Sequence, residues 1–209
     1  MHPIVRNIRL VRKMNNYESI KHLPSEIPAP RQFLRYCFGF NKLTPEEILD
    51  EEISFGYSAK CVNLLSKILG IQKKTVRGWG DNPNFEDMPQ HARTTCSYVQ
   101  VALSSEILKR IASSEYVAPR VTANQFINEM LLKGLSHSER LKIVSSTKFR
   151  GQYLTLLSET LTISKRTIYE WGGDIELPKM PLYHQHTLAY ALAAYRKKQQ
   201  QIIVKRSAA

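Results

Sequence analysis

Cysteine, long apolar runs and acidic residues are all scarce in this sequence. Its three cysteines, Cys37, Cys61 and Cys96, are widely spaced and form no CxxC pair, which argues against a disulfide framework and against a zinc module. No stretch approaches the ~18 uninterrupted apolar residues of a membrane-spanning helix. Charged residues interrupt the apolar residues of the N-terminus, whereas a secretory signal has an uninterrupted apolar core. These absences predict a cytoplasmic protein that does not contact a membrane.

Recognisable catalytic and metal-binding motifs are lacking as well. There is no Gly-rich phosphate loop and no GxSxG string. His184 and His186 are two residues apart, so on a helix they point to different faces and form a poor metal pair. The acidic run EEILDEE (46–52) has the composition of a solvated, dipole-complementing helix start. We therefore expect no enzyme activity, no metal and no cofactor.

Positive charge is abundant. Lysine and arginine number 30 against 18 acidic residues, a net charge of +12 in 209 residues. Such an excess most often serves a polyanion, either nucleic acid or acidic lipid, although solubility alone is an alternative explanation. The hydrophobic share of 43% is enough for one or two folded domains.

The chain contains a repeat with an offset of 92 residues. From Leu64 to Pro89, 11 of 26 positions are identical to those 92 residues later, where chance gives about two. Both tryptophans, Trp79 and Trp171, fall on this register. Thr44-Pro-Glu-Glu and Ser136-His-Ser-Glu share it too, and both have the capping-box pattern of a helix start. The repeat predicts two related units.

The units are expected at 30–117 and 121–206, with residues 1–29 as a basic arm and linker. Apolar residues recur three and four apart and no long run alternates, which predicts an all-α fold of two tandem five-helix units. The helices are expected near 31–40, 45–54, 57–69, 73–80 and 89–112, and near 123–133, 137–146, 148–161, 165–172 and 181–200.

The repeated segment has the pattern of two short helices joined by a tight turn. Leu65 and Leu69 precede Gly70, which can adopt the left-handed conformation of such a turn, and Trp79 closes the small core. Ser66 is small where the second helix crosses. The second copy departs at Thr162, which replaces the glycine and predicts a strained or differently shaped turn. This arrangement is a helix-turn-helix.

Leu-Gly-Ile-x-x-x-Thr-Val-x-x-Trp from Leu69 to Trp79, followed by Met88-Pro89, resembles the helix-turn-helix of the phage-repressor-like (Cro/C1, XRE-type) superfamily. The likeness covers about 50 residues of each unit. It implies that the second helix enters the major groove of double-stranded DNA. It also implies a cytoplasmic location of the kind seen for bacterial or phage nucleoid-associated proteins.

The start of each second helix supplies the candidate DNA contacts. They are Gln72, Lys73, Lys74, Thr75 and Arg77 in the first copy and Ser164, Lys165, Arg166, Thr167 and Tyr169 in the second. Gln72 suits adenine, Arg77 and Arg166 suit guanine, and Lys73 and Lys165 suit phosphates. Because Glu170 reduces the charge of the second copy, we expect the first copy to dominate affinity.

Basic residues also lie near both ends of the chain. Arg6, Arg9, Arg12 and Lys13 form an N-terminal arm, and Arg196, Lys197 and Lys198 belong to a C-terminal tail. Either segment suits phosphate or minor-groove contacts, and a solvated terminal helix is the alternative.

Two functions remain in competition. The first is a sequence-specific DNA-binding protein, most simply a transcriptional regulator, whose diverged copies suit an asymmetric or direct-repeat site. The second is an adaptor in a nucleoprotein complex, for transposition, plasmid, phage or defence functions. In the adaptor, one helix-turn-helix contacts protein, and the acidic residues Glu46, Glu47, Asp50 and Glu51 dock on a partner. Recognition helices on the same face of the molecule favour the first function, and opposed faces favour the second.

Overall fold

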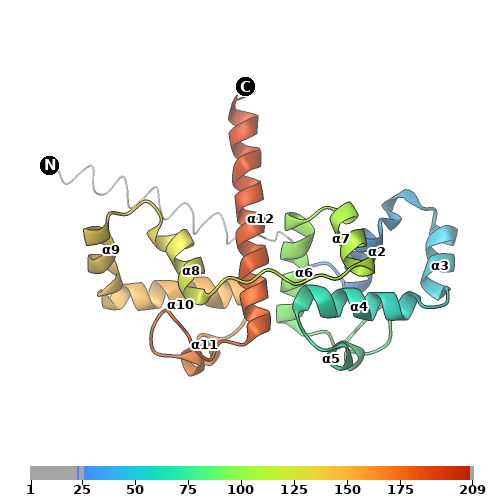
Figure 1. The fold of residues 1–209 in the computed structure, drawn as a ribbon, viewed down its shortest axis with the longest axis horizontal. Helices are drawn as coiled ribbons and strands as arrows, with labels where there is room; N and C mark the ends of the chain where they lie inside the picture. Colours follow the sequence, from blue (N-terminus) through green and yellow to red (C-terminus); the bar gives the residue numbers. More distant parts are fainter. Residues whose placement is uncertain (1–22, 24–25, 208–209) are drawn as a thin grey trace.

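The computed structural model describes Leu23 and residues 26–207, and in that part the chain is helical without any strand (Figure 1). This confirms the all-α prediction. Within the same residues, no helix combines the length and the apolar character needed to cross a membrane.

Helices follow one another closely along the chain and are labelled as in Figure 1. The first half holds α2 (Pro30–Phe38), the 3-10 turn η1 (Phe40–Lys42), α3 (Pro45–Ile53), α4 (Tyr57–Leu69), α5 (Lys73–Arg77), α6 (Gln90–Ala102) and α7 (Ser105–Ser113). The second half holds α8 (Ala123–Ile127), the π-helical turn η2 (Asn128–Leu132), α9 (His137–Val144), α10 (Thr147–Leu161), α11 (Lys165–Trp171) and α12 (Leu182–Ser207).

The segment 89–112 differs from the single helix that the sequence predicted. It consists of α6 and α7, which are separated by two extended residues, Leu103 and Ser104. Ser104 accepts a hydrogen bond from the backbone N–H of Ile107 and begins α7 as its N-cap. The corresponding segment of the second half stays continuous, and α12 runs on to Ser207.

Both predicted capping boxes are present. The backbone N–H of Thr44 donates to Glu47 Oε2 over 2.7 Å, and that of Ser136 donates to Glu139 Oε2 over 2.9 Å. In return, Thr44 and Ser136 accept hydrogen bonds from the backbone N–H groups of Glu47 and Glu139. Each cap contributes about 1 kcal/mol to helix stability.

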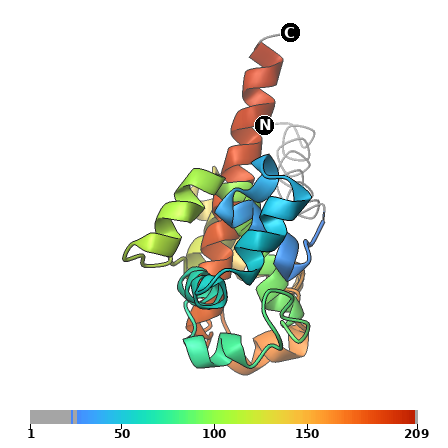
Figure 2. The ribbon, with the colours of Figure 1, turned by 90° about the vertical axis from the view of Figure 1, so that its right-hand side faces the viewer.

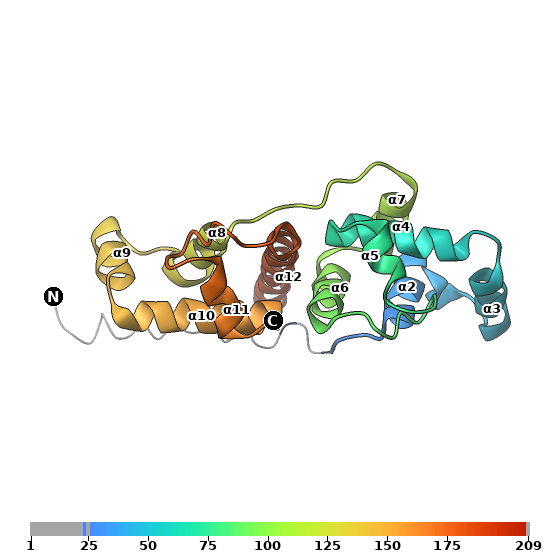
Figure 3. The same ribbon diagram turned by 90° about the horizontal axis from the view of Figure 1, so that it is seen from below.

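Helices α6 and α12 pack against each other at the centre of the molecule. The other helices of the first half lie on one side of this pair, and α8 to α11 lie on the other (Figures 1 and 3). Leucines on α4 and α10, among them Leu64, Leu65, Leu156 and Leu157, are fully buried in the core. The later part of α12 projects beyond the rest of the described chain (Figure 2).

Helix α3 contributes no buried hydrophobic residue to the core, and ion pairs through its Glu52 tie it to α2. Arg31 and Arg35 both donate to the carboxylate of Glu52, Arg35 Nε over 2.8 Å. The Glu52 side chain is only 3% exposed. The hydrogen bonds from the two guanidinium groups, Arg35 first, lower its pKa to about 2, so the carboxylate stays charged above that pH.

Candidate nucleic-acid interface

The connection between α4 and α5 is a tight turn with its own hydrogen bonds. Gly70 adopts a left-handed conformation, with φ at 64°, and ends α4. Ser66 Oγ donates to the carbonyl of Ile71 over 2.5 Å, and Ile71 N–H donates to the carbonyl of Ser66 over 3.2 Å. Val76 of α5 and Trp79, which follows α5, are both buried in the core. Ser66 therefore closes the turn as a hydrogen-bond donor as well as a small packing residue.

The connection between α10 and α11 repeats this geometry. Ser158 Oγ donates to the carbonyl of Ile163 over 2.6 Å, and the N–H of Ile163 donates to the carbonyl of Ser158 over 3.2 Å. Thr162, where the first copy has glycine, adopts the same left-handed conformation, with φ at 52°. Of the two outcomes predicted for this turn, the structure has the strained one, because a side chain at positive φ costs about 1–2 kcal/mol.

The segments that follow the two short helices also match. The carbonyl of Trp79 accepts from the backbone N–H of Asp87, and that of Trp171 accepts from Lys179, each over 3.0 Å. Both indoles are nearly buried, at 8% and 6% exposure. They pack inside the fold and behind the short helices, as expected for core aromatics, and are not available to stack on bases.

All five candidate contacts of the first copy are exposed around the start of α5. Gln72 is the N-cap residue of α5, yet its side chain makes no capping hydrogen bond. Lys73, Lys74 and Arg77 project from the same short helix, and no acidic residue lies between them in the sequence. The surface therefore presents one amide and three cations to solvent.

The second copy presents a different surface. Ser164 Oγ accepts from the backbone N–H of Thr167 over 3.1 Å and also lies 2.9 Å from the Thr167 hydroxyl. The Ser164 hydroxyl caps α11 and the Thr167 hydroxyl contacts it, so both are less available to a ligand than the sequence suggested. Lys165 and Arg166 are exposed, as is Glu170.

Arg150 is a surface residue that the sequence interpretation missed. Its guanidinium carbon lies 4.6 Å from the centre of the Tyr169 ring, a cation–π contact that brings an α10 cation to α11. The contact adds a positive charge to the surface of α11, the helix that also carries Lys165 and Arg166. The sequence held only a weak signal for Arg150, because no local pattern indicates that the start of α10 lies beside α11.

The histidines near the middle of the molecule serve packing. The ring of His184 lies 4.9 Å from that of Trp171 and 5.5 Å from that of His91. Burial first, and then the charge of His91, lower the pKa of His184 to about 3, which keeps the ring neutral at physiological pH. Within the described residues, no three or more His, Cys, Asp or Glu side chains are grouped to hold a metal ion.

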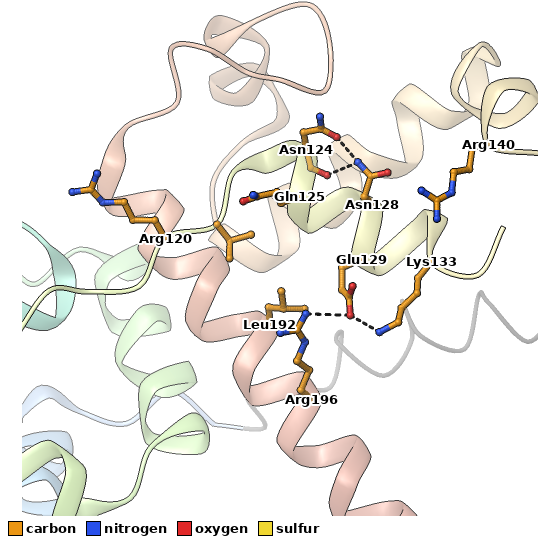
Figure 4. Close-up of a pocket in the computed structure, with 10 residues that line it drawn as sticks. Arg120, Asn124, Gln125, Asn128, Glu129, Lys133, Arg140, Leu192 and Arg196 are labelled. Carbon is orange, nitrogen blue, oxygen red and sulfur yellow. Dashed lines mark hydrogen bonds and ion pairs between the residues drawn. The ribbon is translucent and has the colours of Figure 1, made fainter. Parts of the chain in front are cut away.

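The predicted C-terminal tail, Arg196 to Lys198, lies on α12 away from the short helices α5 and α11. Arg196 is 14 residues into α12, about 20 Å along its axis from the end next to α11. It pairs with Glu129 over 3.3 Å at the rim of an open cavity of about 580 Å³ (Figure 4). Lys197 and Lys198 follow on the part of α12 that runs away from α5 and α11 (Figure 1). The N-terminal arm, Arg6, Arg9, Arg12 and Lys13, lies outside the described residues.

The four acidic residues expected to meet a partner are all exposed on α3. The Glu47 side chain takes part in the capping box, whereas the side chains of Glu46, Asp50 and Glu51 do not. Leu49, Ile53 and Phe55 are exposed beside them, by 53%, 80% and 105%. This apolar component of the α3 surface was not anticipated from the acidic composition.

No protein-family model, no curated protein and no solved structure matches this chain.

Proposed function

We propose that the chain is a non-catalytic, sequence-specific double-stranded DNA-binding protein, most simply a cytoplasmic transcriptional regulator. In this proposal the two halves are tandem units of five helices or more, each with a helix-turn-helix made by α4–α5 and by α10–α11. The equal turn geometry at positions 92 residues apart supports the assignment. The likeness to the phage-repressor-like superfamily remains an inference from sequence.

A single observation carries the proposal. Helices α5 and α11 lie on the same face of the molecule (Figures 1 and 3), with their candidate contacts largely exposed. Had they faced opposite directions, one duplex would not reach both. Cations at the start of a short exposed helix are suited to the phosphates and base edges of a major groove.

The side chains have distinct roles in this proposal. Gln72 reads adenine, and Arg77 and Arg166 read guanine through paired hydrogen bonds. Lys73 and Lys165 neutralise phosphates and set the register. Lys74, Thr75 and Tyr169 line the groove. The Ser164 hydroxyl, which caps the backbone N–H of Thr167 and contacts its hydroxyl, holds α11 in position.

The test is a fluorescence anisotropy titration of labelled duplexes taken from the source genome. We expect one or a few fragments to bind at least about 1,000-fold more tightly than bulk DNA, with affinity falling as salt rises. The salt dependence arises because bound cations release counterions. Binding without sequence preference at moderate salt would contradict the proposal.

The exposed surface of α3 favours a second candidate function, that of an adaptor in a nucleoprotein complex. Leu49 and Ile53 are exposed apolar residues one turn apart on α3, which also carries Glu46 and Asp50, and the exposed Phe55 follows the helix. Exposed apolar surface of this kind marks interaction sites. An acidic rim suits a basic protein partner. In this candidate, DNA binding through α5 continues while α3 docks on protein.

Ile53→Ser with Phe55→Ser tests the adaptor function. We expect the double variant to lose a specific partner in affinity purification while keeping its DNA affinity, because the altered residues lie outside α5 and α11. Leu141→Ser is the matched control, since Leu141 is the exposed counterpart of Leu49 on α9. A partner retained by the double variant, or lost equally by the control, argues against docking through α3.

A further inference from the structure

Equivalent residues of the two halves touch each other where α6 meets α12. The hydroxyls of Thr95 and Thr187, which are 92 residues apart, lie 2.8 Å from each other. The rings of His91 and Tyr183, also 92 residues apart, stack with centroids 5.4 Å apart. Each pair joins a position in one half to the same position in the other. Such self-pairing is a property of a twofold axis.

Contacts beside this axis are reciprocal. His186 of α12 lies against Gly70, the turn residue of the first half, while Thr94 of α6 lies 3.1 Å from Thr162, the turn residue of the second. Positions 94 and 186 correspond, as do 70 and 162. At the level of helices, α12 packs on α4 and α6 packs on α10. A translation between the halves would give only one contact of each kind, so the relation is a local twofold rotation.

The same contacts explain the unlike turn residues. A Cβ atom on Gly70 would lie 2.3 Å from His186 Nε2, so this turn has no room for a side chain. Opposite Thr162 the partner is the smaller Thr94, and the two hydroxyls form a hydrogen bond. Threonine is thus accommodated in one turn and excluded from the other.

The twofold contacts also orient α5 and α11. Gly70 and Thr162 lie three residues before the first residues of these helices, and both are contacted by the opposite half. His186 is itself held by a 2.7 Å hydrogen bond between its Nδ1 and the carbonyl of Pro119. The two short helices are therefore related by the same rotation as the rest of their halves (Figure 3).

We infer that the preferred DNA element consists of two unlike half-sites in inverted orientation, bound by a single chain in one orientation. This inference rests on the proposed function. A twofold-related pair of helices matches the dyad of a duplex, with half-sites about one helical turn apart. The half-sites differ because Gln72 corresponds to Ser164 and Arg77 to Tyr169. The sequence left two kinds of DNA site open, an asymmetric site and a direct repeat. The twofold relation between the halves favours the asymmetric site over the direct repeat.

The test is selection of binding sites from a random duplex library by the full chain, with the mass of the complex measured in parallel. We expect two different half-sites on opposite strands and one chain per duplex. Enrichment of a direct repeat, of a single half-site, or of a site that takes two chains overturns this inference and leaves the proposed function intact. No enrichment of any sequence overturns the proposed function and this inference with it.

A graft variant links each half-site to one copy. Gln72→Ser with Lys74→Arg and Arg77→Tyr gives α5 the exposed contacts of α11. We expect the selected site to become a palindrome, with one half-site changed and the other identical to the wild-type result. The three positions are exposed, so a melting temperature no lower than that of the wild type is the folding control. If both half-sites change, or neither does, the chain does not bind its DNA site in one fixed orientation.

Discussion

Replacing Gly70 with threonine, the residue of the corresponding turn, is expected to lower the free energy of unfolding by about 2–5 kcal/mol. Two effects add. The backbone φ of 64° is costly for any side chain, and the new Cβ would lie 2.3 Å from His186 Nε2. The imidazole cannot easily retreat, because it is 2% exposed and its Nδ1 is hydrogen-bonded to the carbonyl of Pro119. Urea denaturation measures the loss.

Gly56→Ala separates the two effects. Gly56 also has a positive φ, 86°, but nothing lies within 4 Å of a Cβ atom there. We expect this control to lose only the backbone contribution of about 1–2 kcal/mol. A loss as large as that of Gly70→Thr would show that contact with His186 is unimportant.

The double variant Gly70→Thr with His186→Thr tests the reciprocity directly. It recreates at the first turn the threonine pair that Thr94 and Thr162 form at the second. We expect the double variant to be more stable than the sum of the two single effects predicts, by about 1–3 kcal/mol in a double-mutant cycle. Additive losses would mean that residues 70 and 186 do not interact.

Lys73→Ala with Arg77→Ala is expected to weaken binding to the selected DNA site by about 10- to 100-fold. The variant removes the proposed phosphate contact and the proposed base contact from α5, whose residues include three exposed cations and no acid. It is also expected to flatten the dependence of affinity on salt, because fewer counterions are released. Anisotropy titrations at two or more salt concentrations measure both changes.

Lys165→Ala with Arg166→Ala is the matched variant in the second copy, and a smaller loss is expected. Glu170 already lowers the charge there, although Arg150 over Tyr169 restores part of it. All four altered side chains are exposed, so neither variant should change stability appreciably. Equal losses in the two variants would refute the dominance of the first copy.

Local features were predicted well from the sequence. The bounds expected for the helix at 57–69 are those of α4, and both capping boxes have the expected partners. The burial of Trp79 and Trp171 was expected as well. These features depend on residues within a few positions of one another, so their physics is contained in a short window of sequence. The break between α6 and α7 was missed, although Ser104 supplied a capping signal.

The amino-acid sequence by itself determined the helical class, the 92-residue repeat and the cationic residues that precede each tryptophan. Only the tertiary structure decided that the halves meet through a local twofold, that Gly70 is constrained by His186, and that Arg196 pairs with Glu129 far from α5. The physical reason is that these arrangements depend on side-chain packing between α6 and α12 and between other segments distant in the chain. Residue spacing does not encode which surfaces pack together.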